Sequence, residues 1–307
     1  MGGSGFSKVG VVGFGQMGSG IAQVLAQHGF EVTVVDVSEE RLEKGLEAVA
    51  KSLDRLVRRY EKTEGKQGVS PQLRDEALSR ISTSTEVKAL AGMELVIEAI
   101  VENFQAKADL YHALADTGFE GYLASNTSSI SITKLGAETH DPTRFMGMHF
   151  MNPVPIQPGV ELIRGFLTSD ETAERILALA LELEKVPIQA EDKAGFMVNR
   201  IWIPFVNEAV RVVEEGLCSV EDVDKVTHCL AHKMGPLMTA DYVGLDTVLA
   251  ICEVLQAELG DAYRPAPLLR RLVESGQLGL KSGVGFYLWE EGKATKVNPA
   301  VARYRNK

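Results

Sequence analysis

The chain has 307 residues, 45% of them hydrophobic and 24% charged, and a formal net charge of −10. This length suits two domains, and the negative charge argues against general affinity for nucleic acid or an anionic membrane. No run of about 18 apolar residues predicts a membrane span, and three cysteines without metal or redox spacing favour reduced structural thiols.

Residues 1–191 alternate strand-like and helix-like segments, which predicts a Rossmann-type α/β domain with a parallel, doubly wound sheet. Helical patterns lie between the strands, at 16–27, 38–60, 71–80, 103–117 and 170–185, with 38–80 as a helical insertion. The expected strands are 9–12, 32–36, 81–85, 95–100, 122–126, 145–151, 161–165 and 186–190.

Residues 192–307 have a different pattern, with long helical periodicity and no expected strand. The expected helices are 196–214, 220–232, 241–259 and 265–275. We therefore expect a smaller, all-helical second domain that begins near Glu191 to Gly195.

The segment VGVVGFGQMGSGIAQ carries a glycine-rich turn between a strand and a helix. Gly13, Gly15 and Gly18 form G-x-G-x-x-G, in which a tight turn, close backbone approach to a pyrophosphate and helix packing require glycine. Asp36 ends the next strand and can accept hydrogen bonds from ribose hydroxyls, while it would repel a 2′-phosphate. Since no basic residue follows before Arg41, the pattern predicts an NAD site rather than an NADP site.

The second half of segment 38–60 is strongly basic. Lys51, Arg55, Arg58 and Arg59 share one helical face, which suits a phosphorylated ligand. The alternative is a solvated face on which these cations pair with acidic neighbours.

RFMGMHFMNPVPIQPGVE (144–161) contains one histidine, His149, and ends at Glu161. Two strands joined by a turn could bring these side chains together, and a carboxylate would stabilise an imidazolium and fix its tautomer. His149 is therefore a candidate general base. The alternative is a hydrogen-bonded core histidine.

Three other polar features are candidate parts of a ligand site or a metal site. Ser128, in SNTSSISIT, follows a strand at the ligand-binding edge of the sheet, although Ser128 or Ser129 could instead cap a helix. Asn199, in GFMVNR, could donate to a substrate carbonyl or make a structural hydrogen bond. His228 and His232 have i, i+4 spacing but no third ligand in register, so we expect no metal site.

The order of several motifs resembles the L-3-hydroxyacyl-CoA dehydrogenase family, particularly its bacterial 3-hydroxybutyryl-CoA type. The resemblance runs from Val9 to about Tyr287. It rests on GFGQMGSGIA, EAIVENFQAK, LASNTSSISIT, GMHFMNPVP, GFMVNR, NEA, MGPL, GLD, YRPAPLL and GLKSGVGFY.

This resemblance implies NAD-dependent interconversion of an L-3-hydroxyacyl-CoA, of short chain, and its 3-ketoacyl-CoA. His149 would be the acid/base, Glu161 its orienting partner, and Ser128 and Asn199 contacts of the oxygen-bearing acyl portion. Ser52 and Arg59 would contact coenzyme A. The implied NAD neighbours are Gly13, Gly15, Gln16, Met17, Gly18, Asp36, Glu102, Lys107, Ser128, Asn152 and Lys281.

The resemblance also implies a homodimer formed through the helical domain, in the bacterial cytoplasm or the mitochondrial matrix. Gln157-Pro158-Gly159 departs from the family pattern, so we expect an altered backbone near the acyl site. Two alternatives stay open: a dehydrogenase for a dicarboxylyl-CoA or a hydroxy acid without coenzyme A, and a non-catalytic NAD-binding protein.

Overall fold

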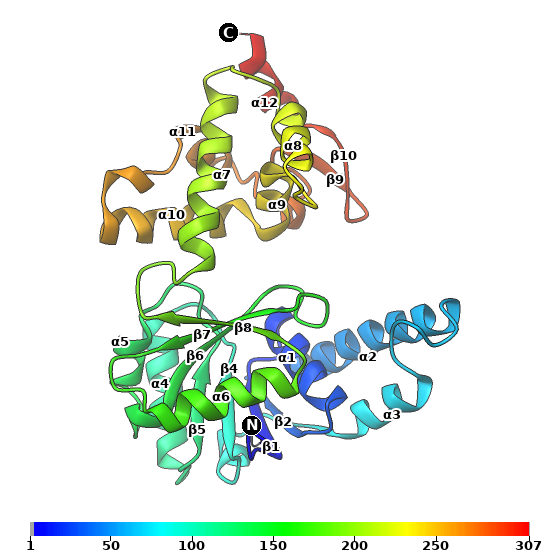
Figure 1. Ribbon diagram of the computed structural model, residues 1–307, viewed down its shortest axis with the longest axis vertical. Helices are drawn as coiled ribbons and strands as arrows, with labels where there is room; N and C mark the ends of the chain where they lie inside the picture. Colours follow the sequence, from blue (N-terminus) through cyan, green and yellow to red (C-terminus); the bar gives the residue numbers. More distant parts are fainter. Residues whose placement is uncertain (1–2, 307) are drawn as a thin grey trace. The chain divides into compact units, whose positions relative to one another are not determined.

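A single eight-stranded sheet organises the first unit of this computed structural model, which describes residues 3–306 (Figure 1). The strand order is β3-β2-β1-β4-β5-β6-β7-β8, so the order reverses between β1 and β4, where open α/β sheets bind ligands. Its strands are β1 (Lys8–Val12), β2 (Glu31–Val35), β3 (Ile81–Ser84), β4 (Leu95–Glu98), β5 (Tyr122–Ser125), β6 (Phe145–Phe150), β7 (Gly159–Arg164) and β8 (Val186–Glu191).

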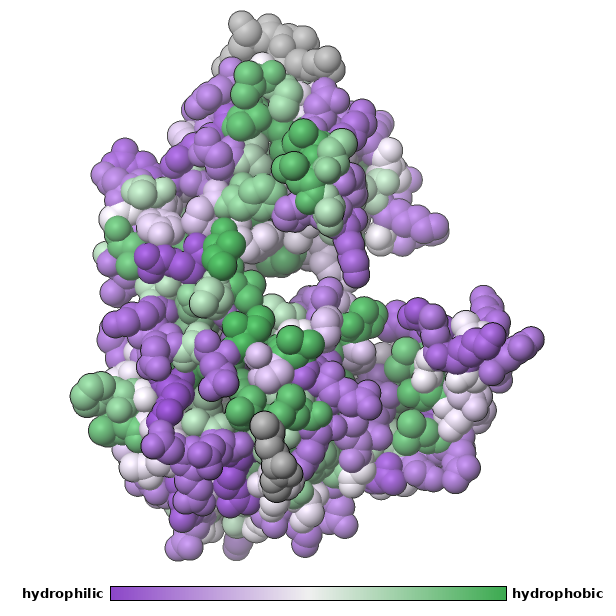
Figure 2. All heavy atoms as spheres, viewed as in Figure 1, coloured by the Kyte–Doolittle hydropathy of each residue, from purple (hydrophilic) through white to green (hydrophobic). Residues whose placement is uncertain are grey.

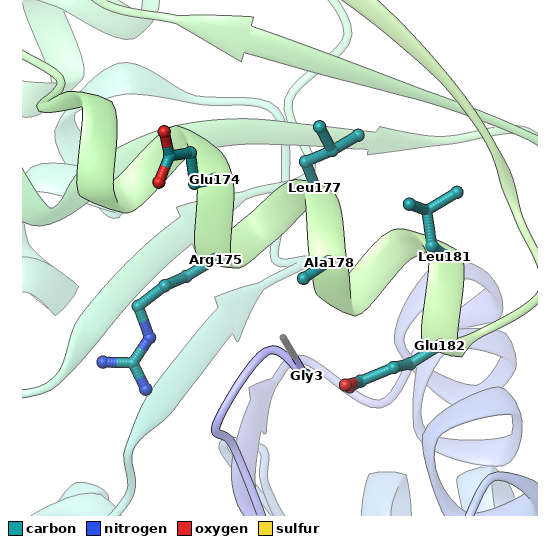
Figure 3. Close-up of a pocket in the computed structure, with 7 residues that line it drawn as sticks. All are labelled: Gly3, Glu174, Arg175, Leu177, Ala178, Leu181 and Glu182. Atoms are coloured by element: carbon teal, nitrogen blue, oxygen red, sulfur yellow. The ribbon is translucent and has the colours of Figure 1, made fainter. Parts of the chain in front are cut away.

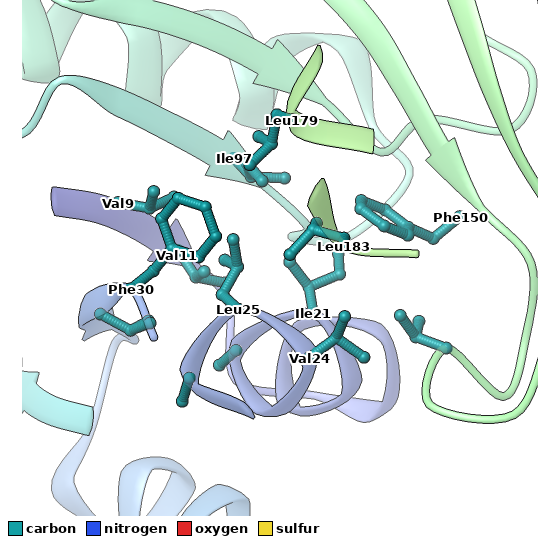
Figure 4. Packing of buried hydrophobic residues seen from close by; sticks show 14 of the residues in the cluster. Val9, Val11, Ile21, Val24, Leu25, Phe30, Ile97, Phe150, Leu179 and Leu183 are labelled. Carbon is teal, nitrogen blue, oxygen red and sulfur yellow. The ribbon is translucent and has the colours of Figure 1, made fainter. Parts of the chain in front are cut away.

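Helices cover both faces of this sheet, as the alternating pattern predicts. On one face α1 and α6 pack on residues from β1 and β4, including Val9, Val11 and Ile97 (Figure 4). On the other face α4 and α5 pack on Val12 and Val96. The helices are α1 (Gln16–Gln27), α2 (Glu39–Lys62), α3 (Pro71–Ser79), α4 (Phe104–Asp116), α5 (Ile132–Gly136) and α6 (Asp170–Glu182).

The sheet is parallel, as predicted, except at β6 and β7. These strands are antiparallel because only the short turn from Met151 to Pro158 connects them, whereas a parallel pair needs a long crossover. Strand β7 begins at Gly159, two residues before its predicted start, and Gly159 pairs with Val186 of β8. Pro158 lies just outside the ladder, where its missing N–H costs nothing.

The insertion after β2 forms α2 and α3, which pack on each other and on α1. Ser38 caps α2 by accepting a hydrogen bond from the Arg41 backbone N–H, as is typical of a helix start. Within the first unit, the outer end of α2 extends beyond the sheet, and hydrophilic side chains cover it (Figures 1 and 2).

The second unit begins at Met197, whereas the predicted boundary falls at the last residue of β8. It is helical as predicted, with an additional hairpin, β9 (Tyr287–Glu290) and β10 (Lys293–Val297). Gly244, with φ of +107°, divides the predicted helix 241–259 in two. The helices are α7 (Val198–Glu214), α8 (Val220–Cys229), α9 (Pro236–Val243), α10 (Leu245–Leu259), α11 (Pro267–Glu274) and α12 (Pro299–Ala302).

Two buried carboxyl groups connect the hairpin to the helices of the second unit. Asp241 accepts hydrogen bonds from the backbone N–H groups of Phe286 and Tyr287 and from Trp289 Nε1, at 2.8 to 2.9 Å. Burial raises the pKa of Asp241 to about 6. Asp224 accepts from the Tyr287 hydroxyl at 2.7 Å and from the first turn of α9.

Among residues 3–306, no helix combines the length and the apolarity needed to cross a membrane.

Candidate active site

The glycine-rich turn after β1 has the backbone that the motif predicts. Gly13 has φ of +92°, and a Cβ atom there would approach the Ala99 carbonyl oxygen to 2.6 Å. A Cβ atom at Gly18 would collide with the Gly13 carbonyl oxygen, so this glycine allows α1 to start close to the strand. At Gly15 a Cβ atom would meet nothing within 4 Å. The backbone at the N-terminus of α1 is thus open on that side, which fits the approach of a pyrophosphate.

Asp36 follows β2 and turns its carboxylate toward the glycine-rich turn. Its two oxygens accept hydrogen bonds from the backbone N–H groups of Phe14, at 2.6 Å, and Val37, at 2.7 Å. Because each carboxylate oxygen can accept more than one hydrogen bond, Asp36 retains capacity for a ribose hydroxyl.

His149 and Glu161 lie directly opposite each other on β6 and β7. His149 Nδ1 is 2.7 Å from Glu161 Oε2, and the glutamate is fully buried while the imidazole is 12% exposed. A carboxylate at this distance accepts the Nδ1 proton, so the lone pair resides on Nε2. The ring of Phe196 packs against the imidazole with centroids 6.2 Å apart. This ring and the carboxylate together fix one orientation and one tautomer of His149.

The loop after β5 is organised by Glu102, which follows β4. Glu102 Oε1 accepts hydrogen bonds from Thr127 Oγ1 at 2.7 Å and from the backbone N–H groups of Ser128 and Ser129, at 2.8 and 2.9 Å. Burial alone would raise the pKa of Glu102, but Lys107 and these donors outweigh it, and the pKa lies below its ordinary value. Glu102 is therefore an anion that shapes the Ser128 loop.

Helix capping by Ser128 or Ser129, one of the two sequence interpretations, is wrong. Ser131 caps α5, its hydroxyl accepting from the Lys134 backbone N–H at 3.2 Å. The Asp192 carboxylate accepts from the Ser131 hydroxyl and from the first N–H groups of that helix.

Asn126 is a structural member of this region that the sequence analysis missed. Its Oδ1 accepts a hydrogen bond from the Phe150 backbone N–H at 2.8 Å, which joins the end of β5 to the strand that carries His149. The sequence feature that could have identified Asn126 is its position directly after a buried strand, at the ligand-binding edge of the sheet.

Gln16 and Asn152, both predicted near NAD, are brought together. Gln16 Nε2 donates to Asn152 Oδ1 at 3.2 Å, so the start of α1 contacts the turn after β6. Lys185 stabilises that turn. Its ammonium donates hydrogen bonds to the carbonyl oxygens of Val154, at 2.6 Å, and Gln157, at 2.9 Å. Burial lowers the pKa of Lys185.

The predicted coenzyme A contacts Ser52 and Arg59 lie on α2, as does the exposed Arg55. The Arg59 guanidinium donates to Gln67 Oε1, with its Nε at 2.8 Å.

Asn199 and Lys281 belong to the second unit. Asn199 is buried in the first turn of α7, and Lys281 Nζ lies 2.5 Å from the Asp246 carboxylate.

Figure 3 shows a surface pocket along α6 that is lined by residues outside the predicted site. Leu177 and Leu181 supply its apolar lining, and the Arg175 guanidinium lies over the rings of Phe6 and Tyr122. None of the predicted site residues lines it.

Both parts of the chain match known families. Residues 8–193 match the family described as 3-hydroxyacyl-CoA dehydrogenase, NAD binding domain, and residues 195–289 match 3-hydroxyacyl-CoA dehydrogenase, C-terminal domain.

Similar proteins extend over nearly the whole chain. A probable 3-hydroxybutyryl-CoA dehydrogenase of Deinococcus radiodurans is 50% identical over 283 residues, 91% of this chain and 99% of that protein. A 3-hydroxybutyryl-CoA dehydrogenase of Bradyrhizobium diazoefficiens is 45% identical, over 93% of this chain and 96% of that protein. The crystal structure of (S)-3-hydroxybutyryl-CoA dehydrogenase from Ralstonia eutropha superposes with a TM-score of 0.86 at 45% identity, covering 93% and 100% of the two chains.

Proposed function

Because this chain belongs to the 3-hydroxyacyl-CoA dehydrogenase family, we propose that His149 is the acid/base of its reaction on a short-chain substrate. The chain is an NAD-dependent 3-hydroxyacyl-CoA dehydrogenase. The observation that carries the assignment of His149 is its 2.7 Å hydrogen bond to the buried Glu161 at the carboxyl edge of the sheet.

The reaction requires one proton acceptor on the protein. His149 Nε2 takes the proton of the substrate's 3-hydroxyl group, while Nδ1–H stays hydrogen-bonded to Glu161. The carboxylate balances the charge of the imidazolium that forms. Bound NAD would supply the acceptor for the hydride of C3. In the opposite direction the imidazolium returns its proton to the carbonyl oxygen of the 3-ketoacyl-CoA.

The residues around the glycine-rich turn fit NAD. Open space beside Gly15 accommodates a pyrophosphate, and the Asp36 carboxylate suits unphosphorylated ribose hydroxyls. We assign the remaining cofactor contacts to Gly13, Gln16, Met17, Gly18, Glu102, Ser128, Asn152 and Lys281. Lys107, whose side chain is 1% exposed, would act on the cofactor through its ion pair with Glu102.

Substrate contacts follow from charge and polarity. The cations of α2, with Ser52 and Arg59 among the contacts, would bind the phosphates of coenzyme A. Ser128 and Asn199 would contact the oxygen-bearing part of the acyl group. A short acyl chain is favoured by the names of the relatives, which are 3-hydroxybutyryl-CoA dehydrogenases.

A homodimer formed through the second unit is also part of the proposal. Helices α7 and α8 carry large apolar side chains with high exposure, such as Ile201 at 66% and Val226 at 56%, with Leu230 at 67% just beyond α8. Leu230→Asp should shift sedimentation toward the monomer, whereas Thr295→Asp on the hairpin should leave it unchanged. A bacterial cytoplasmic location fits the bacterial relatives.

The direct test is loss of NADH absorbance with acetoacetyl-CoA. The wild type should oxidise NADH, and His149→Ala should lose about 10²- to 10⁴-fold in kcat while it still binds NADH. No turnover by the wild type, or full activity of His149→Ala, would sink the proposal. A substrate series from C4 to C16, with dicarboxylyl members, then defines the acyl preference.

The coenzyme A assignment has its own test. Replacing Lys51, Arg55 and Arg59 with alanine should raise KM for acetoacetyl-CoA but not for acetoacetyl-pantetheine, which lacks the adenosine phosphates. Lys44→Ala is the matched control, because Lys44 lies in the first half of α2 and pairs with Glu40. Equal KM changes for both substrates would reject this binding site.

A further inference from the structure

Glu98, at the carboxyl end of β4, is a fully buried carboxylate for which the sequence analysis gave no role. Its Oε1 accepts hydrogen bonds from Lys107 Nζ at 2.6 Å and from the Ile100 backbone N–H at 2.8 Å. Its Oε2 accepts from the Ser125 hydroxyl at 2.7 Å and the Tyr111 hydroxyl at 2.9 Å. Four donors, from the loop after β4, from α4 and from β5, therefore fill the hydrogen-bonding capacity of this carboxylate.

Lys107 is shared between two carboxylates. Its side chain is 1% exposed, and its ammonium lies 2.6 Å from Glu98 Oε1 and 3.4 Å from Glu102 Oε2. The ammonium is thus committed to the interior of the unit. Its influence on any ligand must pass through Glu102.

Glu102 connects Lys107 to the loop of residues 127–129. One of its oxygens, Oε2, faces Lys107. The other, Oε1, accepts hydrogen bonds from the hydroxyl of Thr127 and from the backbone N–H groups of Ser128 and Ser129. A continuous series of contacts therefore leads from the core of the sheet to Ser128. Each step is a charge-assisted hydrogen bond or ion pair, which are the stronger classes of polar contact.

We propose that Glu98 is a positioning residue for the reaction, acting on Ser128 through Lys107 and Glu102. Without the Glu98 charge, Glu102 would be the nearest anion to a buried ammonium and would be drawn toward it, away from the loop. A buried charge that has lost its partner recruits another one or exposes itself. The inference rests on the proposed function only in that Ser128 contacts the reacting groups.

The test compares three variants. Glu98→Gln removes the charge at nearly constant volume. Glu98→Gln/Lys107→Met also removes the cation that the first change leaves behind. Asp224→Asn is the matched control, because Asp224 is a buried carboxylate that accepts three hydrogen bonds within the second unit.

Hydrogen–deuterium exchange of residues 127–131, thermal unfolding and kcat are measured for each protein. Glu98→Gln should unfold at a lower temperature, exchange faster in this loop and lose about tenfold in kcat. The double variant should regain most of the thermal stability but keep the fast exchange and the low kcat. Asp224→Asn should unfold at a lower temperature, with no change in the exchange of residues 127–131 or in kcat.

A purely structural role for Glu98 predicts something different: the double variant would recover kcat together with stability. That result, or unchanged exchange in residues 127–131, would overturn the inference. The exchange measurement needs no substrate. Absence of turnover by the wild type would therefore reject the proposed function and leave the positioning role to be read from exchange.

Discussion

His149 donates its Nδ1 proton to Glu161 across an antiparallel strand pair in which the two residues are direct partners. Backbone hydrogen bonds of β6 and β7 therefore set the distance between the imidazole and the carboxylate. A slip of one residue in either strand would place the two side chains on opposite faces of the sheet.

Glu161→Gln should lower kcat about 10²-fold, because glutamine can accept the Nδ1 proton but cannot balance an imidazolium. NADH affinity should stay within about twofold of the wild type, as neither residue belongs to the glycine-rich turn. Stopped-flow kinetics and fluorescence titration with NADH give the two quantities. In a His149→Ala background the same change should cost little more, since the two residues act as one unit. Independent, additive losses would contradict the pairing.

Asp36→Ala should reduce the preference for NAD over NADP about tenfold or more, a free-energy change of at least roughly 1.4 kcal/mol. In the proposed site this carboxylate would repel a 2′-phosphate and accept hydrogen bonds from ribose hydroxyls. The ratio of kcat/KM for the two cofactors measures the preference. Asp36→Asn serves as the comparison, because it can still accept from the Phe14 N–H but has no charge. If the Asp36→Asn variant kept the full preference, charge would not be its source.

Gly45→Ala should destabilise the protein although alanine is the better helix former by about 1 kcal/mol. A Cβ atom at Gly45 would collide with the ring of Phe14, which belongs to the glycine-rich turn. Overpacking of this kind costs about 1–3 kcal/mol, and the displaced ring should also weaken NADH binding. Thermal unfolding and NADH titration test both effects.

Ala48→Gly is the control for Gly45→Ala, because it changes helix propensity at an exposed position of the same helix. It should lower stability without a change in NADH affinity. A Gly45→Ala variant that unfolds at a higher temperature and binds NADH normally would show that α2 can move away from Phe14 freely.

Asp241 should make the second unit sensitive to pH between about 4 and 6. Its folded pKa is about 6 against an ordinary value of 3.8, so in this range the folded chain holds a proton that the unfolded chain has released. The stability from this group is full at low pH and falls as the pH rises to about 6. The loss amounts to roughly 3 kcal/mol for a shift of this size.

Denaturant unfolding of wild type and Asp241→Asn from pH 4 to 7 isolates this contribution as the difference between the two. Trp289, whose indole donates to Asp241, reports the same ionisation by fluorescence in a Trp202→Phe background. A difference that does not decline toward pH 6, together with a flat Trp289 signal, would rule out this titration.

Much of the first unit could be predicted from short-range patterns. The Val-rich strand, the three glycines and Asp36 lie within one β-α-β unit, where sequence spacing and spatial proximity correspond closely. The cross-strand pairing of His149 and Glu161 was likewise accessible, because twelve residues and one turn separate them.

Contacts over longer sequence distances escaped prediction. Glu98 and Ser125 are 27 residues apart, and Lys185 reaches carbonyl oxygens 28 and 31 residues before it. The hairpin β9–β10 was missed because its strands are short and alternate only weakly between apolar and polar residues. Such contacts depend on topology, which local spacing does not encode.

The buried ammonium of Lys185 has a consequence for how this enzyme can diverge. It holds the 153–158 turn through backbone carbonyls, and backbone carbonyls are present whatever the side chains are. Ile156 is 71% exposed, and Gln157 and Pro158 are exposed as well. Substitutions at these positions can therefore accumulate without moving the strand pair on either side. Gln157 and Pro158, two of the three residues that depart from the family pattern, lie on this exposed turn, whereas Gly159 belongs to β7.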